Sequence, residues 1–228
     1  MTSQDNTITP IRVASLASQV HDALAEMLLS GALRPDDRIS MRDLAERLGV
    51  SVMPVRDAVA RLVAQQALVV LPNRAVAVPL LTRGQFRDLT EVRVHNETHA
   101  AALAARRATQ AQVAALRRAD LAFEQALAAA DAKPAVKANK DLHFVLYEAA
   151  GSPVLVEVIG ALWLKAGPII NLDLEQDTRR RRTAVSRGWH ARLLQAVEAR
   201  DAQAAADAVE ADIRSASEFI LSRDILPA

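Results

Sequence analysis

The sequence predicts a mainly α-helical protein, with an N-terminal winged helix-turn-helix followed by an antiparallel all-helical bundle of about six helices. The chain has 228 residues, which is enough for two domains of ordinary size. Hydrophobic residues make up 51% of it but aromatic residues only 3%, and much of the apolar content is alanine, the strongest helix former. Two β-branched runs separated by a turn lie near residues 67–79, whereas helical spacing continues from there to the C-terminus.

The first 80 residues divide into a lead-in and a small domain. Residues 1–10 are polar, and we expect them to be a disordered lead-in. Residues 11–80 form the predicted winged helix-turn-helix. Its first helix runs from about Ala14 to Ser30, where apolar residues recur at helical spacing, and a loop that contains Gly31 and Pro35 ends it.

Two short helices joined by a tight turn follow this loop. Ser40 and Asp43 predict a capping box that starts the first of them, and Gly49 ends it. Ser51 is a suitable N-cap for the second, whose first turn tolerates Pro54. This arrangement is typical of a helix-turn-helix. The apolar runs at 67–71 and 76–79 then predict the β-hairpin of a wing.

Residues 81–228 are predicted to form a helical domain for effector binding and dimerisation. Helical spacing predicts six helices, near residues 83–107, 110–130, 134–150, 153–171, 180–200 and 202–222. Their length and short connections favour an antiparallel bundle.

Composition excludes several classes of function. The chain has no cysteine, which rules out disulfides, thiolate metal sites and cysteine nucleophiles. No apolar run reaches the roughly 18 residues that a membrane span needs, and Met1 to Pro10 lacks the apolar segment of a signal peptide. We therefore expect a cytoplasmic protein with no membrane partner. The net charge of +1 does not by itself indicate nucleic acid, because a near-neutral protein can still gather its basic residues on one face.

Candidate DNA contacts lie at three places in the first domain. A recognition helix presents polar and basic groups from its N-terminal end, and a wing tip suits the minor groove or phosphates. The candidates are Arg42 in the preceding helix, Ser51, Val52 and Arg56 in the recognition helix, and Asn73 and Arg74 at the wing tip. The pattern alone leaves open a generic small domain without a DNA role.

The run from Leu44 to Leu62 closely resembles the core of the GntR family, and the stretch from Leu28 to Pro35 resembles the segment that precedes this core. The resemblance covers about the first 80 residues. It implies a DNA-binding transcriptional regulator that is not an enzyme, in which the residues at the positions of Arg42, Ser51 and Arg56 contact the operator.

Three positions depart from the family pattern. Val52 stands where the family usually carries a basic residue, Ala75 replaces a usual wing glycine, and Asp36 replaces the glycine of a common Pro-Gly turn. The first two bear on which operator is recognised more than on whether DNA is bound, and the third has only a local consequence.

Four polar residues of the C-terminal part have the types of metal ligands. Asn139 and His143 are four residues apart and share one helix face, while His190 and Asp212 belong to later helices. An amide or carboxylate oxygen combined with two imidazoles suits zinc, manganese or nickel. From the spacing alone, histidines that only form hydrogen bonds in the core are the commoner explanation.

A second resemblance strengthens the metal interpretation. Residues 139–153 resemble the central motif of the ligand-binding (FCD) domain in the FadR subfamily of GntR regulators, and residues 190–201 match its later element. The resemblance implies one divalent metal ion held by an acidic residue and three histidines. Asn139 takes the place of the acid here, and Asp212 takes the place of the third histidine. The alternative is a metal-free pocket in which these groups bind an effector directly. The size of this part implies the VanR-like subgroup.

Arg93 and Asn96 are three residues apart and share a face of the first bundle helix. A guanidinium can hold a carboxylate through two hydrogen bonds. We therefore expect a small organic acid as effector, bound by Arg93 and Asn96 and completing the metal shell. The alternative is a weak surface pair between Arg93 and Glu97 on the same helix.

The expected function is that of a homodimeric, sequence-specific repressor that binds a pseudo-palindromic double-stranded DNA operator and is released by a metabolite. One alternative is a metal-dependent enzyme built on the helical bundle, although the chain has no His-Glu-x-x-His pattern. A helical interaction protein without a DNA role is the other alternative, and it leaves the arrangement of Arg42, Ser51 and Arg56 unexplained.

Overall fold

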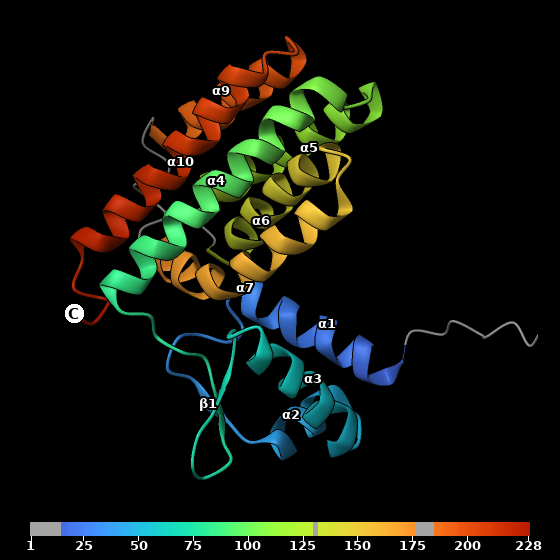
Figure 1. Ribbon diagram of the computed structural model, residues 1–228, viewed down its shortest axis with the longest axis vertical. Helices are drawn as coiled ribbons and strands as arrows, with labels where there is room; N and C mark the ends of the chain where they lie inside the picture. Colours follow the sequence, from blue (N-terminus) through green and yellow to red (C-terminus); the bar gives the residue numbers. More distant parts are fainter. Residues whose placement is uncertain (1–14, 130–131, 177–184) are drawn as a thin grey trace, which may run out of the picture.

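The computed structural model describes residues 15–129, 132–176 and 185–228, with side chains described outside 173–187. The predicted disordered lead-in at 1–10 and the first residues of the helix predicted from 180 lie outside these ranges. Figure 1 shows two parts, a small N-terminal part at one end and a bundle of long helices at the other.

The N-terminal part is a winged helix-turn-helix, as predicted. It contains α1 (Leu16–Leu29), α2 (Met41–Leu48) and α3 (Val52–Ala64), together with β1 (Arg38–Ile39), β2 (Val69–Val70) and β3 (Val76–Ala77). The capping box of Ser40 and Asp43 begins α2, and Gly49 ends it with a left-handed φ of 64°. The three strands form one antiparallel sheet in the order β1-β3-β2. The sequence predicted only the β2–β3 hairpin, because β2 and β3 lie in the apolar runs at 67–71 and 76–79, whereas Ile39 of β1 has no such run around it.

The core of this part lies between its helices and its sheet. Leu24, Leu44, Val55 and Leu62 are fully buried there. One buried side chain of this core, Leu164, comes from a helix of the bundle. The two parts of the molecule therefore share apolar contacts.

The C-terminal part is the predicted antiparallel helical bundle. Its six described helices are α4 (Arg83–Arg107), α5 (Gln110–Ala129), α6 (Ala132–Ala149), α7 (Pro153–Gln176), α9 (Val185–Glu198) and α10 (Ala202–Ser222). A capping box of Thr82 and Gln85 begins α4. Helix α4 lies beside α10 along the bundle, as Figure 1 shows. Alanines 100, 101, 104 and 105 of α4 are fully buried, and their small side chains allow neighbouring helices to approach closely.

Helix α7 connects the two parts. Its segment Pro153–Leu172 is long and apolar enough for a membrane span by length and composition alone, and 44% of its apolar window is buried inside the structure. The Asn171 amide donates hydrogen bonds to the carbonyls of Leu28 and Leu29 at 3.2 and 3.0 Å, where α1 ends. Gly167 also lies against Leu29, whose Cδ2 would be 3.2 Å from an added Cβ. The end of α1 is therefore held against α7 by both shape and hydrogen bonds.

Candidate DNA-binding surface and buried sensor cluster

The side chains predicted to contact DNA lie at the end of the molecule away from the bundle. Figure 1 shows α2, α3 and the β2–β3 hairpin there. Arg42 on α2 and both Ser51 and Arg56 at the start of α3 are exposed, while Val52 is half-buried. Among the described residues, no carboxylate forms an ion pair with Arg42 or Arg56. These cations are therefore available to a phosphate or a base edge.

Local backbone geometry determines how two of these regions present their polar groups. Ser51 is the N-cap residue of α3, but its hydroxyl forms no capping hydrogen bond and so is not used by the helix. At the wing tip, the side-chain Oδ1 of Asn73 accepts a hydrogen bond from the Ala75 N–H at 3.1 Å, which closes the turn. Arg74 has a left-handed φ of 63°, and both Asn73 and Arg74 are exposed.

The four candidate metal ligands are all buried in the bundle. Asn139 and His143 come from α6, His190 from α9 and Asp212 from α10, with exposed fractions between 3% and 8%. His143 Nε2 lies 3.5 Å from Asp212 Oδ2, and His190 Nε2 lies 3.9 Å from Asp212 Oδ1. One ligand atom from each of the two histidines and Asp212 lies within 4.8 Å of the others.

These distances fit the binding of a metal ion. Ligands about 2.0–2.1 Å from a tetrahedral zinc ion are about 3.3 Å apart, close to the smaller of the two observed separations. Asn139 supplies a separate observation, because its Oδ1 atom is buried and no described residue forms a hydrogen bond with it. A buried carbonyl oxygen without a partner is costly, and coordination of a cation removes that cost. The group therefore has the donor atoms and spacing of a site for a divalent metal ion.

A second group of buried polar residues adjoins the metal ligands. Arg93 donates from Nε and Nη2 to the two carboxylate oxygens of Glu97, at 2.7 and 3.2 Å. Glu97 also accepts a hydrogen bond from the Tyr147 hydroxyl, and that hydroxyl lies 3.0 Å from His143 Nδ1. The interpretation of Arg93 and Glu97 as a surface pair is therefore wrong, because Arg93 is 5% exposed and Glu97 is fully buried.

Electrostatics keeps this second group in one protonation state. Burial raises the pKa of Tyr147 well above its ordinary value, and the nearby Glu97 carboxylate raises it further against the opposing effect of Arg93. Burial alone would lower the pKa of Arg93, but its interactions with Glu97 raise this pKa above its ordinary value. Tyr147 therefore keeps its proton and Arg93 keeps its charge.

Aromatic rings surround the two groups. The Trp163 ring of α7 lies 5.2 Å from the His143 ring, and the Arg93 guanidinium lies over the same indole at 5.2 Å. Phe123 of α5 lies 5.0 Å from the His190 ring. Each of the six described bundle helices thus supplies a side chain to this region, which we call the sensor cluster: Arg93, Glu97, Phe123, Asn139, His143, Tyr147, Trp163, His190 and Asp212.

The structure does not bring Asn96 into the sensor cluster. Asn96 is half-buried, and its amide donates a hydrogen bond to the Val92 carbonyl of its own helix at 2.8 Å. His95 and His99 of the same helix are exposed. Of the residues on α4 that the sequence singled out, only Arg93 and its partner Glu97 face the cluster.

Two polar members of the sensor cluster, together with its aromatic residues Phe123 and Trp163, were not recognised from the sequence. Glu97 was considered only as the partner of Arg93 in a surface pair, and Tyr147 was not considered at all. The signal for Tyr147 was its spacing, since Asn139, His143 and Tyr147 follow one another at intervals of four residues and so share one face of α6. It is also the only tyrosine of the chain.

A winged helix-turn-helix with exposed arginines, attached to a helical bundle with a buried polar cluster, defines a DNA-binding transcriptional regulator. Comparison with known proteins supports this class. Residues 16–78 match the bacterial regulatory proteins of the gntR family, and residues 88–215, more than half of the chain, match the FCD domain. The chain therefore belongs to the GntR family of regulators and carries a FadR-like FCD domain, so it is a member of a family of regulators and not of enzymes.

Two curated proteins illustrate the relationship. The chain is 35% identical over 154 residues to the HTH-type transcriptional regulator McbR of Escherichia coli, covering 68% of this chain and 70% of that protein. It is 31% identical over 137 residues to the Nta operon transcriptional regulator of Aminobacter aminovorans, covering 60% of this chain and 64% of that protein.

Solved structures agree with the fold. The structure of E. coli McbR/YncC superposes with a TM-score of 0.86 at 29% identity and covers 92% of this chain and 99% of that one. A GntR regulator from Rhodococcus sp. RHA1 superposes with a TM-score of 0.73 at 20% identity, over 90% of this chain and 97% of that one, which shows similarity of fold alone.

Proposed function

We propose that this regulator is a homodimeric, metabolite-responsive repressor of the VanR-like subgroup, acting in the cytoplasm on a specific double-stranded DNA operator. The observation that carries the proposal is the separation of two kinds of polar residue. Exposed arginines gather on α2, α3 and the wing, whereas residues with the chemistry of metal and anion ligands converge in the bundle. One end of the chain is suited to DNA and the other to a small charged ligand.

The proposed DNA contact uses the exposed start of α3. Ser51 and Arg56 enter the major groove, where an arginine can donate two hydrogen bonds to a guanine. Arg42 binds the backbone or a base edge, and Asn73 and Arg74 of the wing bind phosphates or the minor groove. Val52 offers an apolar contact where a basic side chain is usual in the family. Two copies related by a two-fold axis place their α3 helices in successive major grooves of a pseudo-palindromic site.

The proposed ligand site is centred on the metal ligands. Asn139, His143, His190 and Asp212 would hold one zinc, nickel or manganese ion. When bound, the ion supplies positive charge and a coordination position for an anionic oxygen. The chain's own residues fix the four donor atoms, and Phe123 and Trp163 exclude water around them.

The charge of the sensor cluster favours an organic acid as effector. One cation, Arg93, and two carboxylates, Glu97 and Asp212, give the cluster a formal net charge of −1 when both imidazoles are neutral. A divalent ion changes this balance to +1, which favours an anion in a site of low dielectric constant. Glu97 occupies Nε and Nη2 of Arg93, so an effector carboxylate is received by Nη1. Asn96 takes part only if it first releases the Val92 carbonyl.

Helix α7 is the element through which we propose that effector binding in the sensor cluster affects the DNA-binding part. Trp163 lies against His143 and Arg93, and the next residue, Leu164, is buried in the core of the DNA-binding part. An effector that shifts Trp163 therefore shifts the surface on which α1 packs. The operator affinity then changes according to the effector's differential affinity for the two arrangements.

The metal site is tested by elemental analysis of purified full-length protein. The variants His143→Ala and His190→Ala each lose the bound metal, while His95→Ala and His99→Ala, which alter exposed histidines of α4, retain it. Full metal occupancy in both of the buried-site variants would contradict the site.

The DNA-binding and effector roles are tested by fluorescence anisotropy with an operator selected from random duplexes. Operator affinity falls steeply as salt rises from about 50 to 200 mM, because phosphate contacts release counterions. A panel of small mono- and dicarboxylic acids contains one that weakens binding of the wild type but not of His143→Ala. A protein without sequence preference, or without a response to any acid of the panel, would contradict the proposal.

A further inference from the structure

A continuous chain of hydrogen bonds links Arg93 to the metal ligand His143. Arg93 donates to Glu97, Tyr147 donates to Glu97, and the Tyr147 oxygen lies 3.0 Å from His143 Nδ1. All four side chains are at most 5% exposed. Water therefore does not compete for these hydrogen bonds, and each proton must be supplied by a member of the chain.

The chemistry of the four groups fixes the direction of every hydrogen bond. A carboxylate paired with a guanidinium only accepts, so the single hydroxyl proton of Tyr147 is donated to Glu97. Toward His143, the Tyr147 oxygen can then only accept. His143 must therefore carry a proton on Nδ1, and in the neutral imidazole the lone pair lies on Nε2.

This orientation matters because of what Nε2 faces. His143 Nε2 is the atom that lies 3.5 Å from Asp212 Oδ2. A lone pair and a carboxylate oxygen repel each other at that distance, and a cation between them turns the repulsion into attraction from both sides. We call this chain of hydrogen bonds from Arg93 through Glu97 and Tyr147 to His143 the relay. Because the relay places the proton on Nδ1, the Nε2 lone pair of His143 is free to bind a metal ion and cannot donate a hydrogen bond to Asp212.

We propose that Tyr147 and Glu97, held in place by Arg93, are positioning residues that select Nε2 of His143 as the metal-binding atom and so tune the affinity of the site. The inference rests on the metal site proposed above. It assigns Arg93 a role besides effector binding, since Arg93 keeps Glu97 in place as an acceptor. Outer hydrogen bonds of this kind typically change metal affinity by about 10–100-fold.

The first test removes the acceptor for the Nδ1 proton. The variant Tyr147→Phe preserves the ring and its packing, and we expect its zinc affinity to fall by about 10–100-fold, measured on the full chain by competition with a chromophoric chelator. Ser217→Ala is the matched control, because it removes a buried hydroxyl that bonds to Thr90 between α10 and α4, outside the relay. Equal zinc affinities of Tyr147→Phe and the wild type would overturn the proposal.

The second test reverses the relay without changing its shape. In Glu97→Gln, an amide oxygen in the place of Oε1 keeps the hydrogen bond from Arg93 Nε, while an amide NH₂ in the place of Oε2 gives up the bond from Arg93 Nη2 and donates to Tyr147. Tyr147 must in turn donate its proton to His143 Nδ1, which leaves the proton of the imidazole on Nε2. Zinc affinity should again fall at least about 10-fold, although the side chain has the same volume. If Tyr147→Phe fails to fold, Glu97→Gln still tests the proposal by itself.

Nitrogen-15 NMR of the histidines separates this inference from the metal site itself. In metal-free wild type, His143 is expected as the Nδ1–H tautomer, and in Glu97→Gln as the Nε2–H tautomer. Wild type that shows this tautomer but binds no zinc would refute the metal site alone. Wild type that binds zinc while His143 is an imidazolium, or an Nε2–H tautomer, in the metal-free chain would refute the relay alone.

Discussion

Three arginines of each part of this molecule illustrate two opposite uses of the same side chain. In the DNA-binding part, Arg42, Arg56 and Arg74 are exposed, and no described carboxylate pairs with them. In the bundle, Arg93, Arg117 and Arg214 all form ion pairs with glutamates. The same residue type therefore provides charge for a partner in one part and is paired with carboxylates in the other.

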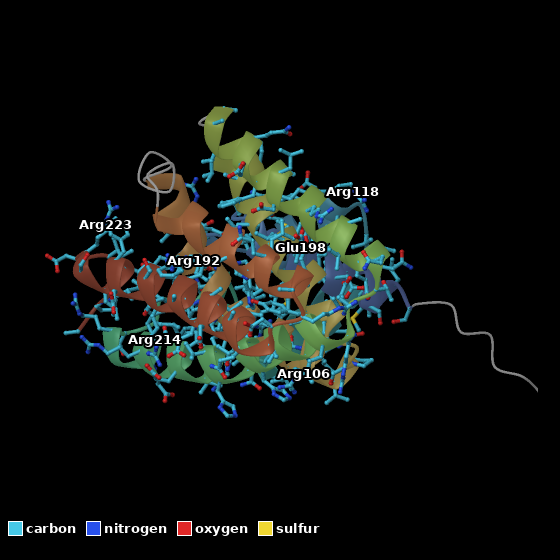
Figure 2. The ribbon with its side chains drawn as sticks, turned by 90° about the horizontal axis from the view of Figure 1, so that it is seen from above. Arg106, Arg118, Arg192, Glu198, Arg214 and Arg223 are labelled. Atoms are coloured by element: carbon cyan, nitrogen blue, oxygen red, sulfur yellow. The ribbon has the colours of Figure 1, made fainter. Side chains whose placement is uncertain are left out.

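Figure 2 labels several arginines of the bundle, among them Arg192 of α9 and Arg214 of α10, which lies on the side of α10 that faces α4. Arg214 bonds to both Glu91 and Glu210, and these hydrogen bonds raise its pKa well above the ordinary range. An exposed arginine without an ion-pair partner, such as Arg56, loses no such interaction within the protein when it is substituted. This difference indicates that substitutions in the DNA-binding part affect binding, whereas substitutions of buried pairs in the bundle affect stability.

The largest effect is expected from Arg93→Met. This change leaves the Glu97 carboxylate buried without its cation, which should lower the free energy of unfolding by about 3–5 kcal/mol. The corresponding fall in Tm is about 10 °C, measured by thermal denaturation of metal-free protein. Arg117→Ala, which breaks an exposed pair with Glu198, serves as the control and should leave the Tm unchanged within error. Similar Tm values for the two variants would mean that the buried Arg93–Glu97 pair contributes no more to stability than the exposed Arg117–Glu198 pair.

The next effect is expected from Arg56→Ala. It should weaken binding to the selected operator by about 1–3 kcal/mol while leaving the Tm unchanged. Arg61→Ala is the matched control, because Arg61 lies near the opposite end of the same helix, where its guanidinium is 3.4 Å from the Ser18 hydroxyl. The assignment fails if operator affinity is the same in Arg56→Ala as in the wild type.

A smaller effect is expected where the two parts meet. Asn171→Ala removes the donors to the carbonyls at the end of α1 and should cost about 1–2 kcal/mol of stability. Hydrogen exchange at α1 should become faster in this variant, because local opening there becomes easier. Asn96→Ala removes an amide that bonds only within its own helix and should not change exchange at α1. An unchanged rate of hydrogen exchange at α1 in Asn171→Ala would argue that these hydrogen bonds do not hold the end of α1 against α7.

The smallest effect is a gain in stability from Asp36→Gly. Asp36 has a left-handed φ of 65°, a region that glycine enters without steric cost. The strain relieved exceeds the chain entropy lost, and we expect about 0.5 kcal/mol of stabilisation and a small rise in Tm. A lower Tm for this variant would mean that the Asp36 side chain has a favourable role in the turn.

The sequence predicted the long helices well because their signals are local. The bounds of α4 and α10 agree with the predicted 83–107 and 202–222, where caps and breaks in helical spacing mark the ends. Helix α7 continues to Gln176, five residues beyond the predicted end, because the prediction stopped where the apolar run ends and the mixed polar residues after it still allow a helix. Strand β1 was missed because, unlike β2 and β3, it does not lie in a β-branched run.

The sensor cluster was predicted only in part, for a similar reason. Residue types and the resemblance to the FCD domain pointed to Asn139, His143, His190 and Asp212, and the fold brings ligand atoms of His143, His190 and Asp212 within 4.8 Å of one another. Whether Arg93 and Glu97 form a surface pair or a buried one depends on what packs against α4, and the helix sequence does not contain that information. The link from Glu97 to Tyr147 spans 50 residues and exists only in the folded bundle.

Both tryptophans of the chain, Trp163 and Trp189, belong to the bundle, and the DNA-binding part has no tryptophan. Trp163 touches His143, and Trp189 precedes His190 in α9 and lies under the Arg192 guanidinium at 4.7 Å. Intrinsic tryptophan fluorescence of the unlabelled protein therefore comes from the bundle alone, even when operator DNA is present. Titrations of metal or effector can be followed optically on the same sample whose DNA occupancy is read from a dye on the duplex.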